Sequence, residues 1–227
     1  MAQRAELRES VLSELERSFT LVKQDLGEDA TLSKRGMTFE TESWTIEGVG
    51  HLCIMRMRAF LGLMRMETAV IAPTCVDVPL FNLDWVKALG AEAQIAELYD
   101  TQLSPWPDES QAKFEFIGAQ YADLPDAPGE IAHWYDDILY PCSFHKKGKG
   151  MTERLSLAAQ EYLVAYIGQL LGAPACDALA KRAKVGSFAE RLFAEGGPAV
   201  NQVTQLFGEQ TAKRLILQHM YGVDPQA

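Results

Sequence analysis

Alternating apolar and polar residues mark the first half of this chain, and helical spacing marks its second half. Residues 37–47 alternate and are rich in Thr, Trp and Phe, which is typical of a β-strand. Further apolar runs, separated by short breaks, predict strands over residues 51–60, 64–72, 80–86 and 93–99. Short turns between consecutive strands favour an antiparallel sheet over repeated βαβ units.

Helical periodicity flanks these strands. Residues 3–25 place apolar side chains at helical spacing with charges between them, which predicts an amphipathic helix. A short helix is expected near residues 110–120, and residues 135–144 favour an extended run that leads into a basic loop at 145–150. The remaining helices are expected over residues 152–171, 175–193 and 199–221.

Apolar residues on both faces of the expected strands indicate that helices cover both sides of the sheet. The predicted fold class is α+β, a three-layer α/β/α sandwich with a central antiparallel sheet. We expect a single domain over residues 1–227, with an N-terminal helix and linker (1–36), the sheet (37–144) and C-terminal helices (151–227). A chain of 227 residues, 48% of them hydrophobic, is long enough to bury such a core.

The net charge of −10 narrows the choice of partners. Nucleic-acid binding needs clustered Lys and Arg, so the composition argues against it. The same acidity argues against docking on anionic membranes, and no apolar run of spanning length occurs. No apolar segment follows the charged N-terminal residues, so we expect no secretory signal and a cytoplasmic location.

The cysteines and histidines do not predict a metal site. Cys53, Cys75, Cys142 and Cys176 are widely spaced without a CxxC pair, whereas zinc and iron–sulfur sites need closer spacing. We expect reduced thiols in the core or in a pocket wall.

Asp100 is the first candidate for chemistry. It ends the apolar run 93–99, and a carboxylate beside a buried strand is costly to desolvate unless it has a partner or a function. Next to a pocket it would be a proton donor with a raised pKa. The alternative is a strand-end carboxylate that accepts backbone hydrogen bonds in a turn.

Two basic groups suggest binding surfaces. Arg56 and Arg58 share one face of a strand and could clamp carboxylates, or else form an ion-pair ladder with Glu47 and Glu67. The basic loop is either a solvated turn or a docking patch for an acidic electron carrier. Its lysines are Lys146, Lys147 and Lys149.

Several segments resemble one family when their order is considered. An apolar strand ending in Pro precedes a PLF-x-x-D run (TAVIAPTCVDVPLFNLDWV), and IAELYDTQL follows. HWYDDILYPCSF and QLFGEQTAKRLILQHMYGVD come later in the chain. Together, from about residue 40 to residue 224, these segments resemble the ferredoxin-dependent bilin reductases, to which the red chlorophyll catabolite reductases are related.

The resemblance implies a fold, an activity and an electron source. The fold would be an α/β/α sandwich whose substrate lies between the sheet and the C-terminal helices. The activity would be reduction of a biliverdin-like linear tetrapyrrole by alternating electron and proton transfers. No bound flavin or nicotinamide is implied, because electrons would come from reduced ferredoxin or flavodoxin.

The resemblance also implies residue roles. Asp100 matches the family's proton-donating aspartate, whereas the family's histidine, glutamate and distal aspartate fall at Thr68, near Arg56 and near Gly197. The residues expected to contact substrate are Arg56, Arg58, Thr68, Glu67 and Phe81. Two alternatives remain open: a non-catalytic tetrapyrrole carrier on the same fold, and a reductase of a chlorophyll catabolite.

Overall fold

The structure is a computed structural model that describes residues 7–127 and 133–223. Its strands are β1 (Leu21–Lys23), β2 (Thr31–Lys34), β3 (Met37–Ile46), β4 (Gly50–Ala59), β5 (Met64–Pro73), β6 (Leu80–Ala88), β7 (Ala91–Tyr99) and β8 (Phe144–Gly148). Its α-helices are α1 (Leu7–Glu16), α2 (Asp108–Ala119), α3 (Thr152–Gly172), α4 (Ala178–Glu195), α5 (Pro198–Phe207) and α6 (Glu209–Lys213). Short 3₁₀ segments are η1 (Gly27–Ala30), η2 (Phe60–Gly62) and η3 (Trp134–Ile138), and the π-helical η4 (Arg214–Met220) continues α6.

The described strands form one antiparallel sheet of eight strands. Their order is β1-β3-β4-β5-β6-β7-β8, and β2 also pairs with β3. Consecutive strands from β3 to β7 are neighbours, as short turns require. The predicted antiparallel sheet is therefore confirmed.

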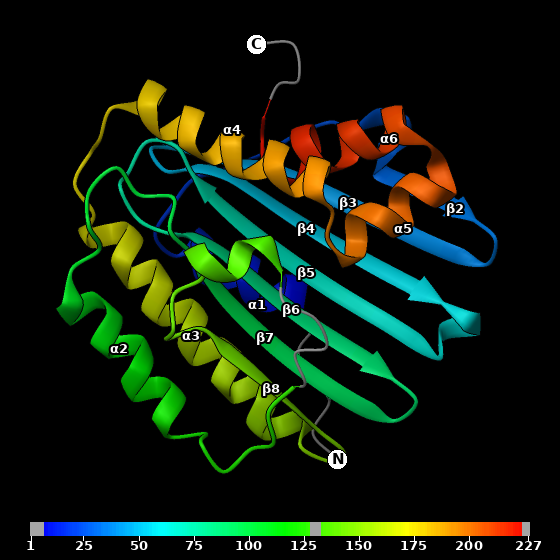
Figure 1. Cartoon of the computed structure of the whole chain (residues 1–227), viewed down its shortest axis with the longest axis horizontal. Helices are drawn as coiled ribbons and strands as arrows, with labels where there is room; N and C mark the ends of the chain where they lie inside the picture. The colour runs from blue at the N-terminus through cyan, green and yellow to red at the C-terminus, as the bar shows by residue number, and fades with distance from the viewer. Residues whose placement is uncertain (1–6, 128–132, 224–227) are drawn as a thin grey trace.

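Helices cover both faces of this sheet (Figure 1). One face packs against α1, α2 and α3, with Ile54, Ile71 and Phe81 among its buried residues. The other face packs against the C-terminal segments α4 to η4, with Met55 and Val70 among its buried residues. Because side chains alternate along a strand, neighbouring residues belong to different layers, and the predicted three-layer sandwich is confirmed.

The N-terminal helix is shorter than predicted. It ends at Glu16, and residues 21–23 form strand β1, in which Leu21 is the register partner of Ile46 on β3. The prediction of a helix over 3–25 is therefore wrong for residues 17–25. Backbone pairing with the sheet edge is more favourable here than a helix that would contain the β-branched Thr20 and Val22.

The extended run predicted at 135–144 is wrong over its first residues, whereas Leu139 is extended and forms a single antiparallel bridge with Tyr99. Residues 134–138 form the 3₁₀ segment η3, where the Asp136 carboxylate accepts a hydrogen bond from the His133 backbone N–H at 2.8 Å. The strand lies later, at β8, and includes most of the expected basic loop. Lysine is common on edge strands because its charge discourages further pairing, which explains how a basic segment forms this strand.

Candidate functional site

A cluster of polar side chains lies on the sheet face that the C-terminal helices flank. It comprises residues from β5, β6, β7 and β8, which we call the polar cluster: Thr68, Asn82, Asp84, Glu97, Tyr99 and His145. The sheet register brings these residues together, because Thr68 lies opposite Asp84 and Asn82 lies opposite Glu97. Val70 and Leu80, which share this face, belong to the core layer under the C-terminal helices.

Hydrogen bonds link the polar cluster. The Asn82 side-chain amide donates to Asp84 Oδ2 and to Glu97 Oε2, each at 2.9 Å. The Tyr99 hydroxyl donates to the same Glu97 oxygen at 2.7 Å. On the far side, His145 Nε2 lies 3.2 Å from Glu97 Oε1, an ion-pair distance without the alignment of a hydrogen bond. Glu97 is therefore the carboxylate with the most partners in the cluster.

Asp84 has fewer hydrogen-bond partners than Glu97. Its Oδ1 is buried and has no hydrogen-bond partner among the described residues. Burial and the neighbouring charge of Glu97 raise the pKa of Asp84 to about 6, although contacts with Thr68 and Asn82 act to lower it. An acid whose pKa lies near neutral pH can hold a proton and release it to a reacting group. Asp84 is therefore suited to general acid catalysis.

His145 and Glu97 form a charged pair beside this acid. Contact with the Glu97 carboxylate raises the pKa of His145, despite the opposing effect of burial. Burial acts to raise the pKa of Glu97, but contacts with His145, Tyr99 and Asn82 lower it on balance. The pair therefore favours a protonated imidazole and an ionised carboxylate, which makes His145 a second candidate proton source.

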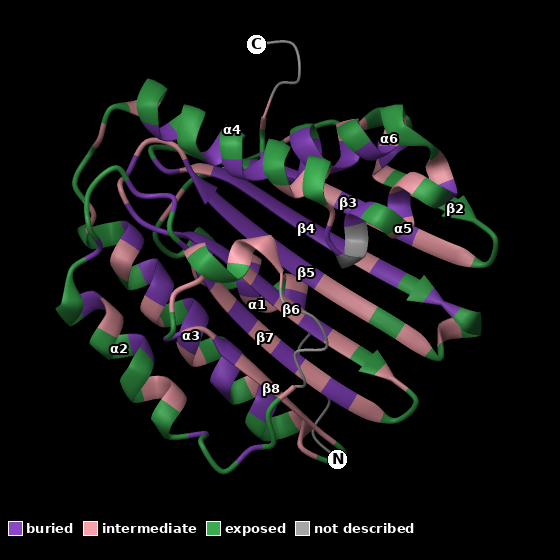
Figure 2. Cartoon of the chain, in the orientation of Figure 1, coloured by how far each residue is buried: buried purple, intermediate pink, exposed green. Residues whose placement is uncertain are grey.

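The sheet face around the polar cluster is not fully covered by helices. Asn82, Asp84 and Glu97 are half-buried, unlike the fully buried residues under α4 and η4 (Figure 2). Apolar residues of the same strands are also half-buried here: Met64, Met66, Val86, Ala93 and Ile95. A ligand could therefore reach the cluster over an apolar floor.

Aromatic rings border this region. Tyr99 contacts Phe188 on α4 and Tyr135 on η3, with ring centroids 4.9 and 5.8 Å apart. Trp134 lies 5.7 Å from Phe188, and the Arg191 guanidinium lies 4.5 Å above the Trp134 ring. Flat, polarisable rings suit a conjugated planar ligand. No group of three or more potential metal ligands occurs among residues 7–127 and 133–223.

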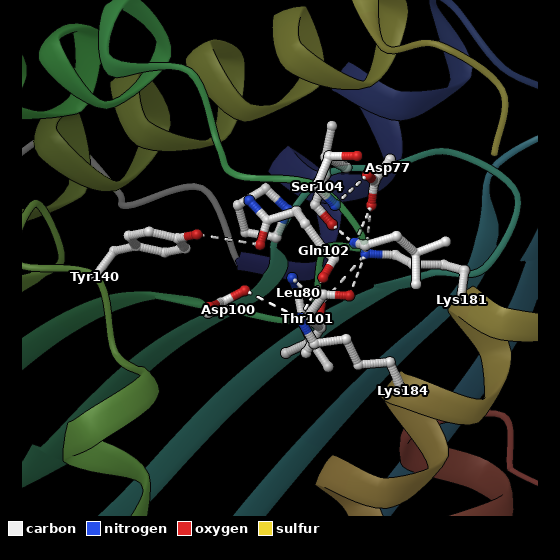
Figure 3. Close-up of polar contacts among 12 residues, drawn as sticks. Asp77, Leu80, Asp100, Thr101, Gln102, Ser104, Tyr140, Lys181 and Lys184 are labelled. Carbon is white, nitrogen blue, oxygen red and sulfur yellow. Dashed lines mark hydrogen bonds and ion pairs between the residues drawn. The ribbon is translucent and has the colours of Figure 1, made fainter. Parts of the chain in front are cut away.

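Asp100 does not lie in this cluster. Its side chain is 49% exposed and forms an ion pair with Lys184 of α4, at 3.3 Å (Figure 3). The prediction of a carboxylate beside a buried pocket is wrong for this residue, because the strand ends at Tyr99 and the next residue turns outward. Its backbone N–H donates to the Ile138 carbonyl oxygen at 2.8 Å, while its carboxylate pairs with a lysine side chain and not with the backbone N–H groups of a turn that the alternative interpretation expected.

Other predicted contact residues lie on the opposite sheet face. Arg56 pairs with Glu40 at 3.1 Å, and Arg58 belongs to the same side of β4. Glu67 accepts a hydrogen bond from the Leu7 backbone N–H of α1 at 2.7 Å. Phe81 is buried and stacks on Tyr166 of α3, with centroids 4.5 Å apart. The prediction that these four residues line a site under the C-terminal helices is therefore wrong, because their side chains lie on the sheet face toward α1–α3. Thr68 alone among the predicted contact residues lies in the polar cluster.

The expected docking lysines lie on or beside the edge strand β8. Lys146 forms an ion pair with Asp126 at 2.6 Å, so part of its charge is neutralised. Lys147 is half-buried and Lys149 is exposed just beyond the strand.

Sequence reasoning missed Asp84, Glu97 and His145. Asp84 is the acid of the PLF-x-x-D run, in the middle of an apolar strand. A carboxylate between Leu83 and Trp85, in the middle of an apolar strand, indicates a buried acid more strongly than a carboxylate at the end of a strand. The sequence alone could therefore have identified Asp84. Glu97 and His145 become significant only through the pairing of β7 with β8.

Comparisons with known proteins bear on the fold. No family model matches this chain, and no curated protein matches its sequence. Among solved structures, the chain is similar to phytochromobilin synthase from tomato, whose crystal structure was determined in complex with biliverdin. The TM-score is 0.79 at 15% sequence identity, over 98% of this chain and 84% of that chain. The chain therefore has the fold of a bilin reductase, as the sequence resemblance predicted.

Proposed function

We propose that this chain binds a biliverdin-like linear tetrapyrrole on the sheet face at the polar cluster and reduces it, with Asp84 as the proton donor. The observation that carries the proposal is the environment of Asp84, a half-buried acid on the sheet face, with a pKa of about 6 and one buried oxygen that has no partner among the described residues. The fold shared with a protein crystallised with biliverdin supports a tetrapyrrole as the ligand.

The proposed chemistry needs no bound cofactor. An external donor, reduced ferredoxin or flavodoxin, would transfer one electron to the pigment. The resulting radical would take a proton from Asp84, and a second electron and a second proton would complete the dihydro product. His145 is the proposed source of the second proton, because contact with Glu97 raises its pKa. Docking of the electron donor near Lys146, Lys147 and Lys149 remains part of this proposal.

The aromatic border would position the pigment. Stacking against Tyr99, Tyr135 and Trp134 would hold a conjugated ring system over the strands. The single amide of Asn82 bridges both acids, so it would fix the distance between the proton donor and the ionised Glu97. Asn82 is therefore a positioning residue in the proposal.

Titration with biliverdin followed by addition of reduced ferredoxin tests this function. We expect a red-shifted bound spectrum that then bleaches or shifts further as the pigment is reduced. A bound spectrum that stays unchanged with reduced ferredoxin and with reduced flavodoxin would indicate the carrier alternative. Reduction of a chlorophyll catabolite but not of biliverdin in the same assay would identify the other alternative.

A further inference from the structure

Three turns lie together at one end of the sheet, at the right of Figure 1. They connect β2 to β3, β4 to β5 and β6 to β7. We call this surface the hairpin end and define it as residues 34–36, 58–65 and 87–90. Cross-strand pairing places the turns side by side, because Arg58 lies opposite Arg65 and Arg65 lies opposite Lys87.

The turns contain large residues in a left-handed backbone conformation. Phe60, Leu61 and Leu89 have φ angles of 52°, 57° and 50°, and Arg35 has 52°. These are all the described non-glycine residues with positive φ. Left-handed geometry costs a residue with a Cβ more than it costs Gly, and Asn tolerates it better than Leu or Phe. The choice of residues is therefore unfavourable for folding.

The same residues are apolar and exposed. Leu61 is 105% exposed and Leu89 is 88% exposed, while Phe60 and Leu63 are each 68% exposed. Side chains this exposed gain almost nothing from the hydrophobic effect in the isolated chain. Backbone strain and exposed apolar side chains thus occur at the same residues of the hairpin end, and neither stabilises the folded chain.

A row of basic side chains lies directly behind these tips. Arg58, Arg65 and Lys87 are exposed and occupy neighbouring register positions on β4, β5 and β6. Like charges directly opposite one another destabilise a sheet. Lys87 is partly neutralised by Glu92 at 2.9 Å, and Arg65 donates to the Gly62 carbonyl oxygen at 3.3 Å.

We propose that the hairpin end docks on an anionic lipid bilayer, with the apolar tips inserted and the basic row at the headgroups. Each tip lies two or three residues along the chain from the nearest residue of the basic row, which at about 3.3 Å per residue is a reach of at most about 10 Å. Interfacial apolar groups enter a bilayer to a similar depth, and nearby cations strengthen the attachment. The net charge of −10 argued against such docking, but the hairpin end carries five basic residues and no acidic one.

A protein partner fits these features less well. Four separately projecting apolar side chains would need a shaped recess for each, whereas a bilayer accepts them without shape complementarity. The fold contributes no spanning segment either, because none of the described helices is long and apolar enough to cross a membrane. The proposed attachment is therefore peripheral and reversible.

Vesicle cosedimentation of the full chain tests the proposal. The probes are phosphatidylcholine vesicles with and without phosphatidylserine, with no other protein present. We expect binding only to the vesicles that contain phosphatidylserine, and weaker binding as salt rises. Replacing Arg58 and Arg65 by Gln should lower the partition constant about 30-fold, at about fivefold per basic residue. The charge-matched control replaces the exposed Lys113 and Arg182 by Gln.

The variant Leu61→Asn with Leu89→Asn tests the apolar tips separately. Asn accepts left-handed geometry, so this variant should unfold at the same or a higher temperature while it loses binding at least tenfold. The matched control is Phe116→Asn with Leu179→Asn, at residues that are 70% and 78% exposed on other surfaces. Absence of binding to anionic vesicles at low salt, or equal losses in test and control variants, would overturn the proposal.

Discussion

Replacing Asp84 by Asn should make the protein more stable at neutral pH. The pKa of this carboxyl rises from an ordinary 3.8 to about 6 in the folded chain, mainly because of burial. Each pKa unit corresponds to about 1.4 kcal/mol, so ionising Asp84 in the folded state costs about 3 kcal/mol. Asn has nearly the same shape and no charge to desolvate, so the variant should recover up to this amount.

The sign of the pH dependence follows from proton binding. Because the pKa is higher in the folded chain than in the unfolded chain, the folded chain binds more protons between pH 3.8 and about 6. The contribution of Asp84 to stability is therefore fully present below pH 3.8 and is lost as the pH rises through about 6. The advantage of the Asp84→Asn variant should be about 3 kcal/mol at pH 7.5 and about 1.5 kcal/mol at pH 5.

Urea unfolding of both proteins at these two pH values, followed by circular dichroism, measures this advantage. Asp100→Asn is the matched control, because Asp100 is exposed and its ion pair with Lys184 lies at the surface. Its substitution should change the unfolding free energy by less than about 0.5 kcal/mol. A stability gain for Asp84→Asn that is equal at both pH values, or a loss at pH 7.5, would refute the reasoning about burial.

Two further predictions concern the frame that holds the sheet and helices together. Tyr166→Phe should lower the unfolding free energy by about 1–2 kcal/mol, because the buried Tyr166 hydroxyl donates to the Pro79 carbonyl oxygen at 2.6 Å and the variant removes this bond. Thermal unfolding by calorimetry measures the loss, and an unchanged unfolding midpoint would contradict the prediction. Gly50→Ala should destabilise by about 3 kcal/mol, because a Cβ at this position would clash with the backbone carbonyl oxygen of Ala72. Gly168→Ala is its control, since a Cβ there meets nothing within 4 Å and Ala favours a helix, so equal losses in both variants would contradict the packing argument.

The sequence predicted the sheet well because its physical signals are local. Alternation and turn residues fixed β3 to β7, and the described pairing follows from the short connections between them. The N-terminal region was predicted less well, since β1 exists only through its pairing with β3. Strand β8 was missed for the same reason: its partner β7 lies more than 40 residues earlier in the chain.

The candidate site was harder to predict than the fold. The sequence pattern placed the candidate acid at Asp100, which is half-exposed at the strand end, whereas the half-buried aspartate on the sheet face is Asp84. The distinction depends on which side chain faces the accessible sheet face, and a shift of register by one residue changes that face. Glu97 and His145 meet across two strands, a contact that no spacing in the sequence encodes.

Lys181 illustrates a buried charge that serves the fold. Its side chain is 0% exposed, and its ammonium group donates to the carbonyl oxygens of Val78 and Thr101 at 2.7 Å each (Figure 3). Burial lowers the pKa of Lys181 to about 8, although the nearby Asp77 carboxylate acts to raise it. These bonds join α4 to the loops before β6 and after β7, so they fix the helix that supplies Phe188 to the aromatic border.

Single-turnover reduction of bound biliverdin by Asp84→Asn tests the central claim most directly. The variant and the wild-type chain would each be mixed with biliverdin and reduced ferredoxin without oxygen, and followed by absorbance and electron paramagnetic resonance. We predict that Asp84→Asn binds the pigment with unchanged affinity and accumulates a bilin radical, whereas Asp100→Asn completes the reduction. Full reduction by Asp84→Asn at the wild-type rate would contradict the account.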